Sequence, residues 1–192
     1  MSPLEQILAH AAAGPPSCGV VRVIAIDGRS GSGKTSLAGV VAREWGAPVV
    51  SMDAIYPGWS GLAAATPLLV THVLQPLTEG GHPVVPTWDW LADRAGPVLP
   101  LAVDDRLVIE GCGSSAGAAS RLEGTRVWLD GPADLRRQRA LDRDGAVFAE
   151  HWEMWAEQEA ALFAADRTRE RAHLTFEMSP AGGPVDDRPT GR

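Results

Sequence analysis

Apolar residues along the chain form short β-branched runs that alternate with longer segments of helical periodicity. The runs typical of strands buried on both faces of a sheet lie at residues 20–26, 48–52, 106–110, 126–129 and 173–177, with a further extended segment at 84–88. The helical segments lie at residues 4–13, 35–45, 66–79, 132–143 and 148–171. Strands and helices that alternate in this order predict an α/β fold, a three-layer sandwich around a mostly parallel sheet of about five strands.

Proline and glycine mark the boundaries of these elements. Residues 1–16 are a lead-in helix and linker, residues 1–178 form one domain, and the Pro/Gly/Asp-rich residues 179–192 are expected to be a disordered tail. Residues 53–65 are rich in glycine, proline and small side chains, which is typical of a loop. The Thr66-Pro67 pair then has the pattern of an N-cap followed by a first-turn proline, so the next helix is expected to begin there.

Lys34 is the only lysine among the 17 lysine and arginine residues of the chain. It lies in the segment Gly28-Arg29-Ser30-Gly31-Ser32-Gly33-Lys34-Thr35, which has the G-x-x-x-x-G-K-T spacing of a phosphate-binding loop. A strand is predicted before this segment and a helix after it, a context that a chance Gly/Ser-rich turn would lack. The sequence therefore predicts a bound nucleoside triphosphate, ATP or GTP. The residues expected to contact it are Gly28, Ser30, Gly31, Ser32, Gly33, Lys34, Thr35 and Ser36.

Acidic residues follow several of the predicted strands, where ligands of parallel sheets bind. Glu110 ends a buried apolar run and, with the Thr35 hydroxyl, is a candidate ligand for Mg²⁺; Asp53 is a further candidate ligand. Asp53 is also the candidate base that would orient an acceptor hydroxyl and take its proton. The plainer alternatives are a turn aspartate at Asp53 and a solvated strand-end acid at Glu110.

Three arginines, Arg136, Arg139 and Arg143, share one face of the predicted helix at 132–143. Such a face would clamp a triphosphate, with the bend at residues 142–145 acting as a lid and with Arg139 and Arg143 as the candidate catalytic pair. The alternative is a solvated helix face whose arginines pair with Asp134, Asp142 and Asp144.

Aromatic residues lie on the segments expected to face the acceptor side of the site. The candidate substrate-contacting residues are Tyr56, Trp59, Trp88, Asp89, Trp90 and Arg94. Indole rings suit a planar or apolar substrate, and Asp89 and Arg94 are candidates for hydrogen bonds to its hydroxyls. Partly buried loop anchors are an equally open interpretation of Trp59 and Trp90.

Over residues 20–177 the chain resembles the uridine kinase group of P-loop kinases, which includes pantothenate kinase and phosphoribulokinase. The resemblance rests on residues 28–35, 52–56, 85–90, 108–111 and 129–130 and on the arginine-rich helix that follows. It implies a P-loop NTPase fold with an arginine-bearing lid, ATP and Mg²⁺ as cofactors, and phosphorylation of a hydroxyl on a small molecule, a nucleoside or another metabolite. It also implies Asp53 near the acceptor hydroxyl and Glu110 near the magnesium. The base-reading histidine of uridine kinases has no counterpart here, since no histidine occurs between His82 and His151.

Charge and composition exclude several classes of partner. The net charge of −7 makes a nucleic-acid polymer an unsuitable partner. No apolar stretch has the roughly 18–20 residues that span a bilayer, and the N-terminus lacks a basic lead, so a cytoplasmic protein without a membrane partner is expected. The sequence leaves a homodimer open.

An alternative from another functional class is a nucleotide-hydrolysing switch or regulatory ATPase without a small-molecule acceptor. A GTPase would carry an N/T-K-x-D guanine motif, which is absent because Lys34 is the only lysine. A nucleotide-binding remnant with an inactive acceptor site also stays open.

Overall fold

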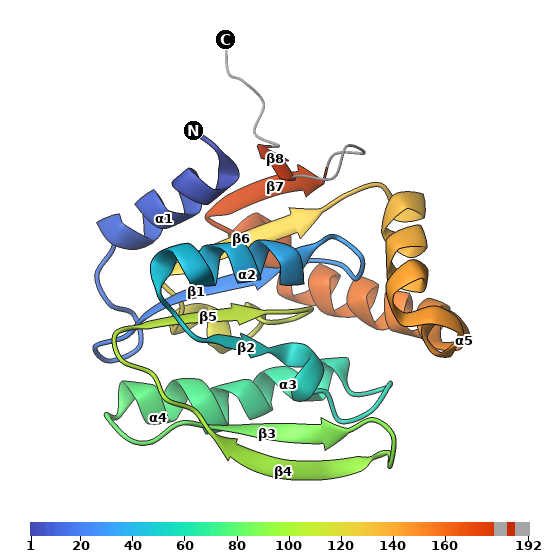
Figure 1. The fold of residues 1–192 in the computed structure, drawn as a ribbon, viewed down its shortest axis with the longest axis horizontal. Coiled ribbons are helices and arrows are strands. Elements are labelled where there is room, and N and C mark those ends of the chain that lie inside the picture. Colours follow the sequence, from blue (N-terminus) through green and yellow to red (C-terminus); the bar gives the residue numbers. More distant parts are fainter. Residues whose placement is uncertain (179–183, 187–192) are drawn as a thin grey trace.

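A six-stranded sheet lies at the centre of the computed structural model, which describes residues 1–178 and 184–186 (Figure 1). Its strands run in the order β2-β5-β1-β6-β7-β8. Their bounds are β1 Arg22–Asp27, β2 Val49–Ser51, β5 Arg106–Glu110, β6 Thr125–Asp130, β7 Leu174–Met178 and β8 Pro184–Asp186. Strands β2, β5, β1, β6 and β7 are parallel to one another, and of the described strands in this sheet only β8 is antiparallel to its neighbour, β7. This topology confirms the predicted, mostly parallel sheet.

Helices cover both faces of the sheet and complete the three layers. On one face lie α1 Pro3–Ala13 and α2 Lys34–Trp45, which pack on Ile24 and Ile26 of β1. On the other face, the neighbouring β1 residue Val23 packs among residues from α3 Leu62–Leu69, η2 Val70–Leu74, α4 Gln75–Thr78 and α5 Ala133–Asp166. The remaining short helices are η1 Met52–Ala54, η3 Ala119–Arg121 and α6 Thr168–Arg171. Among the described residues, no helix combines the length and apolar character needed to cross a membrane.

The helix expected to begin at Thr66 begins earlier, at Leu62, so the predicted N-cap is wrong. Thr66 is buried inside the helix, and its hydroxyl donates to the carbonyl of Gly113 at 2.9 Å. The alanine-rich residues 63–65 favour helix strongly enough to extend it backwards. Further along, Pro76 lacks the N–H that would donate a helical hydrogen bond to the carbonyl four residues before it. The preceding turn is a wider π turn, in which Gln75 N donates to the carbonyl of Val70.

Two further segments differ from expectation. The extended stretch near residue 84 is β3 Val84–Asp89, and it pairs with an unpredicted strand, β4 Arg94–Pro100, in a separate antiparallel hairpin. Glycine and proline at positions 96, 97 and 100 conceal β4 from a propensity argument. Within the expected disordered tail, residues 184–186 form β8 on the edge of β7, so the prediction is wrong there; the rest of 179–192 lies outside the described residues.

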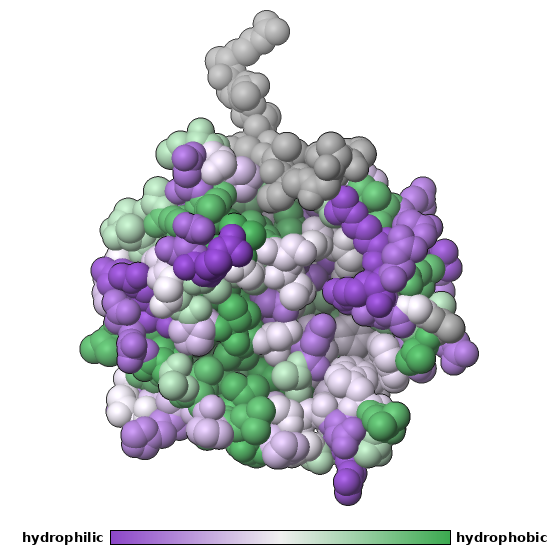
Figure 2. Space-filling model, viewed as in Figure 1, coloured by the Kyte–Doolittle hydropathy of each residue, from purple (hydrophilic) through white to green (hydrophobic). Residues whose placement is uncertain are grey.

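The long helix α5 is bent into two arms at Gly145, whose φ and ψ of 68° and −151° lie outside the helical region. Figure 1 shows the elbow projecting at one side of the sheet, and Figure 2 shows hydrophilic residues gathered over the arm that precedes it. The bend predicted at residues 142–145 is therefore confirmed. It brings both arms of α5 close to the carboxyl ends of the parallel strands.

Candidate active site

Residues 28–33, which link β1 to α2, form the loop predicted to bind phosphate, called the phosphate loop below. Three glycines of this loop have left-handed φ values: 140° at Gly28, 77° at Gly31 and 91° at Gly33. Gly31 lies against the backbone of Arg136 on α5, where a Cβ would be only 2.7 Å from the Arg136 carbonyl carbon. A side chain at Gly31 would therefore collide with α5 as well as strain the loop.

The Lys34 ammonium lies against this loop, and the residue is only 7% exposed. Its Nζ donates to the carbonyl of Arg29 at 2.9 Å and to Cys112 Sγ at 3.5 Å. Burial alone would lower the pKa of Lys34, but the acidic groups around it, including Glu159 and Glu110, outweigh burial and raise the pKa. Lys34 is therefore a buried, permanently charged cation at the start of α2.

Asp27, the last residue of β1, fastens the phosphate loop to the segment after β5. Its carboxylate accepts bonds from Gly28 N at 2.7 Å, Gly113 N at 2.8 Å, and both the N–H and hydroxyl of Ser115 at 2.8 and 2.9 Å. Burial raises the pKa of Asp27, and these four bonds act in the opposite direction. The loop is thus held in place before any ligand binds.

A hydroxyl and a carboxylate meet at the end of the loop, as the sequence predicted for Mg²⁺. Thr35 Oγ1 donates to Glu110 Oε2 at 3.2 Å, and Ser51 Oγ donates to Glu110 Oε1 at 2.5 Å. Glu110 is 2% exposed, and the register of β5 places it beside Ile26 of β1 and Ser51 of β2. Among the described residues, no three His, Cys, Asp or Glu side chains gather into a metal cage. A hydroxyl with one carboxylate suits Mg²⁺, which keeps water and phosphate oxygens among its ligands.

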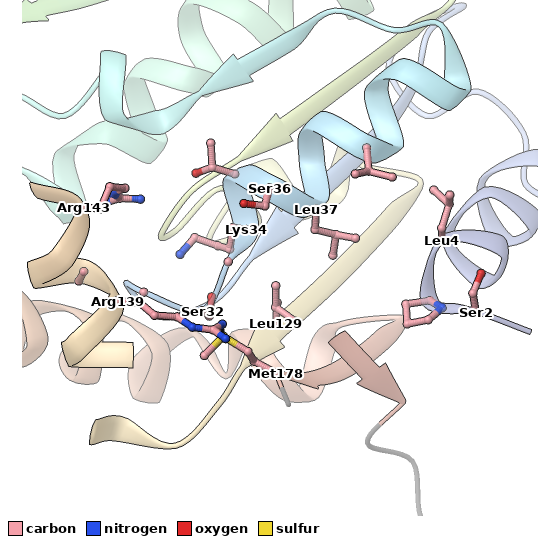
Figure 3. A pocket seen from close by; sticks show the side chains of 16 residues that line it. Ser2, Leu4, Ser32, Lys34, Ser36, Leu37, Leu129, Arg139, Arg143 and Met178 are labelled. Carbon is pink, nitrogen blue, oxygen red and sulfur yellow. Dashed lines mark hydrogen bonds between the residues drawn. The ribbon is translucent and has the colours of Figure 1, made fainter. Parts of the chain in front are cut away.

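A cavity of about 700 Å³ opens over the phosphate loop (Figure 3). Gly31, Ser32, Gly33, Lys34, Thr35, Ser36, Arg139, Arg143 and Met178 are among the residues that line it. In Figure 3 the Lys34 ammonium extends towards the arm of α5 that carries Arg139 and Arg143. Arg139 Nη1 contacts Met178 Sδ at the end of β7. The structure thus brings six of the eight predicted phosphate-binding residues, all but Gly28 and Ser30, and both candidate catalytic arginines to one cavity.

A second cavity of about 570 Å³ adjoins the first, since Thr35 and Arg143 line both. Its polar lining includes the predicted residue Asp53, which is exposed. Its apolar wall consists of five rings: Tyr56, Trp59, Trp90, Phe148 and Trp155. Trp59 is central to them, with its ring centroid 4.9 Å from that of Trp90 and 5.6 Å from that of Phe148.

The other predicted substrate residues lie elsewhere. Asp89 Oδ1 accepts the backbone N–H groups of Leu91 and Ala92 at 3.1 and 3.0 Å, which makes it the turn residue of the β3–β4 hairpin. Arg94 lies opposite Asp89 in the strand register of that hairpin, and it is exposed. Trp88 packs near Gly58. None of the three lines either cavity, because the unpredicted strand β4 folds this segment back on itself.

The arginine face of α5 is divided between two roles. Arg136 is buried and donates to the carbonyls of Gly131 at 3.0 Å and Ser30 at 3.2 Å, so it holds the loop rather than facing a ligand. Arg143 pairs with the adjacent Asp144 through bonds of 2.8 and 2.6 Å, which raise the pKa of Arg143. The predicted alternative of pairing with aspartates therefore applies to Arg143, although its side chain also lines both cavities.

Comparison with known proteins identifies the fold of this chain. No protein-family model matches the chain, and no curated protein matches its sequence. A solved structure of a possible uridine kinase from Bacillus stearothermophilus superposes with a TM-score of 0.60 at 21% identity, over 90% of this chain and 96% of that chain. This chain has the P-loop kinase fold. A putative fructose transport system kinase from Silicibacter sp. TM1040 matches with a TM-score of 0.52 at 20% identity, over 88% of this chain and 92% of that chain.

One buried residue at the site of this P-loop kinase fold belongs to no recognisable sequence motif. Glu159, on the second arm of α5, is 1% exposed and accepts the Ser30 N–H of the phosphate loop at 2.7 Å. It is separated from Ser30 by 129 positions in the chain, so only the folded structure brings them together. The sequence signal that was available is an acid within the apolar stripe that contains Trp155 and Phe163.

Proposed function

We propose that the protein is an ATP- and Mg²⁺-dependent phosphotransferase that acts on a hydroxyl of a small molecule. The observation that carries this proposal is the junction of two cavities at Thr35 and Arg143. One cavity contains the phosphate loop, and the other, of about 570 Å³, has the size of a pocket for a small metabolite. A protein that only hydrolyses a nucleotide needs no second pocket of this kind.

The residues at the junction suit transfer to a hydroxyl. The acceptor oxygen would form a bond to the γ-phosphorus while the bond from that phosphorus to the β–γ bridging oxygen breaks, and ADP leaves. Asp53 would orient the acceptor hydroxyl and take its proton. Lys34 would contact the β- and γ-phosphates from below, and Arg139 and Arg143 would neutralise charge from the side of α5.

Thr35 Oγ1 and Glu110 would hold Mg²⁺, because their oxygens already lie 3.2 Å apart at the end of the phosphate loop. The ion would neutralise charge that develops on the transferring phosphate. Asp53 lines the same cavity as Thr35, and its role as a further metal ligand stays a prediction.

The lining of the second cavity supports an acceptor that carries a flat or apolar portion, a nucleoside or another ring-bearing metabolite. Tryptophan rings offer large apolar faces with one indole donor each. The Trp90 indole is already used, since its Nε1 donates to the carbonyl of Asp53 at 2.9 Å. Trp90 therefore fixes the backbone of the proposed base while its ring forms part of the wall.

A panel of nucleosides, vitamins, sugars and hydroxylated aromatic compounds, each assayed with Mg·ATP for ADP release, tests the proposal. We expect one class of acceptor to raise ADP release well above the background hydrolysis and to yield a phosphorylated product by mass spectrometry. Uniform background hydrolysis across the panel would instead favour the alternative of a nucleotide-hydrolysing switch.

A further inference from the structure

The two arms of α5 hold one residue of the phosphate loop from opposite sides. Arg136, before the elbow at Gly145, donates to the carbonyl oxygen of Ser30 at 3.2 Å. Glu159, after the elbow, accepts the N–H of the same residue at 2.7 Å. The peptide groups on both sides of Ser30 are therefore fixed by side chains of a single helix, and the loop cannot move independently of it.

Glu159 connects this loop to the wall of the second cavity. Its Oε1 atom also accepts the indole Nε1–H of Trp155 at 3.1 Å and the thiol of Cys112 at 3.1 Å. Trp155 is one of the rings that line the acceptor cavity, and Ser30 lines the same cavity. One carboxylate oxygen thus has donors from the phosphate loop, from the segment after β5, and from the acceptor wall.

Burial makes these three bonds interdependent. Glu159 is 1% exposed, so water does not replace a donor that moves away. A buried carboxylate that loses a donor carries a large desolvation cost, and it therefore follows its remaining donors. A displacement of the Trp155 indole consequently changes the bond that holds the Ser30 amide.

We propose that Glu159 is a positioning residue that couples the acceptor cavity to the phosphate loop through Trp155 and Ser30. The proposal rests on the proposed function, since it assigns the two cavities to acceptor and nucleotide. An acceptor seated against Trp155 would change the affinity of the loop for a nucleotide, and a bound nucleotide would change the affinity for the acceptor by the same factor, because coupling between two binding sites is reciprocal.

The reciprocal direction is testable without knowing the acceptor. Protein labelled with ¹⁵N at its tryptophan indoles is titrated with Mg·AMP-PNP, and the resonances are assigned by Trp155→Phe and Trp152→Phe. Trp152 is the reference, because it is buried on the same arm of α5 but is not among the donors to Glu159. We expect the Trp155 indole to shift more than that of Trp152 in the wild type, and this excess to vanish in Glu159→Met, which keeps the length of the side chain but removes the acceptor oxygen. An excess shift that persists in Glu159→Met, or none in the wild type at saturation, would overturn the proposal.

A second measurement applies where Glu159→Met does not fold. Calorimetry should show that Trp155→Phe, which keeps a ring in the wall but lacks the indole N–H, weakens Mg·AMP-PNP binding about three- to tenfold, the range of one net hydrogen bond. Trp152→Phe should bind as the wild type does. Equal affinities of Trp155→Phe and wild type would reject the coupling while leaving the kinase proposal intact. Absence of nucleotide binding in the wild type itself would reject the proposed function, and this inference with it.

Discussion

Replacing Gly31 with alanine would place a methyl group between the phosphate loop and the first turns of α5. The backbone of Gly31 has a φ of +77°, and the added Cβ would lie 2.7 Å from the carbonyl carbon and 2.9 Å from the Cα of Arg136. Left-handed backbone costs a non-glycine residue about 1–2 kcal/mol, and overpacking against a rigid neighbour adds about 1–3 kcal/mol. We therefore expect Gly31→Ala to lower the free energy of unfolding by about 2–5 kcal/mol.

Two other glycines provide matched controls for urea denaturation. A Cβ at Gly33, with φ +91°, meets nothing within 4 Å, so Gly33→Ala should show only the conformational cost of about 1–2 kcal/mol. A Cβ at Gly39, inside α2, also meets nothing within 4 Å, and Gly39→Ala should stabilise the protein by about 0.5–1 kcal/mol. A Gly31→Ala protein as stable as Gly33→Ala would refute the conclusion that the loop is packed tightly against α5.

Three further substitutions test the site and its surroundings. Lys34→Met removes a cation buried near Glu159 and Glu110, so urea denaturation should show a free energy of unfolding lower by about 3 kcal/mol. Turnover should fall about 10²–10³-fold. Wild-type stability together with wild-type turnover would contradict the proposed role of Lys34. Asp53→Asn, at an exposed position, should change stability by less than about 0.5 kcal/mol and keep Mg·AMP-PNP binding measurable by calorimetry, while phosphorylation of the acceptor falls about 10²–10⁴-fold; native-rate transfer would eliminate Asp53 as the base. Partial burial, then Arg126 and His10, lower the pKa of His173 to about 4, so the folded state binds fewer protons than the unfolded chain between that value and the usual 6.5. Stability should therefore fall as the pH decreases from 6.5 to 4, and fall less in His173→Asn; equal pH dependences would show that His173 is not responsible.

The elements that place the phosphate loop follow from local sequence patterns. The β-branched run before Gly28 and the helical pattern after Lys34 are both short-range signals, and the structure has β1 and α2 at those positions. The bend of α5 is equally predictable from the sequence, because Gly145 interrupts an otherwise helical stretch. Local chemistry determines each of these features, so one sequence suffices to predict them.

The features that could not be predicted depend on contacts between distant segments. Glu159 is one acid among several on a charged helix until folding places it against Ser30. Strand β4 exists because it pairs with β3, despite a sequence rich in proline and glycine, and this pairing removes Asp89 from the acceptor side. Position along a strand therefore predicted that Glu110 lies beside Thr35, whereas Trp88, Asp89 and Arg94 of the hairpin line neither cavity.

We propose that residues 28–35, Lys34 among them, hold the phosphates of a nucleotide. A crystal structure with Mg·AMP-PNP tests this proposal most directly. We expect the β- and γ-phosphates on the backbone N–H groups of the loop, with Lys34 Nζ turned from the Arg29 carbonyl to the phosphates. A fully occupied ligand bound elsewhere, with Lys34 Nζ still 2.9 Å from the Arg29 carbonyl, would contradict it.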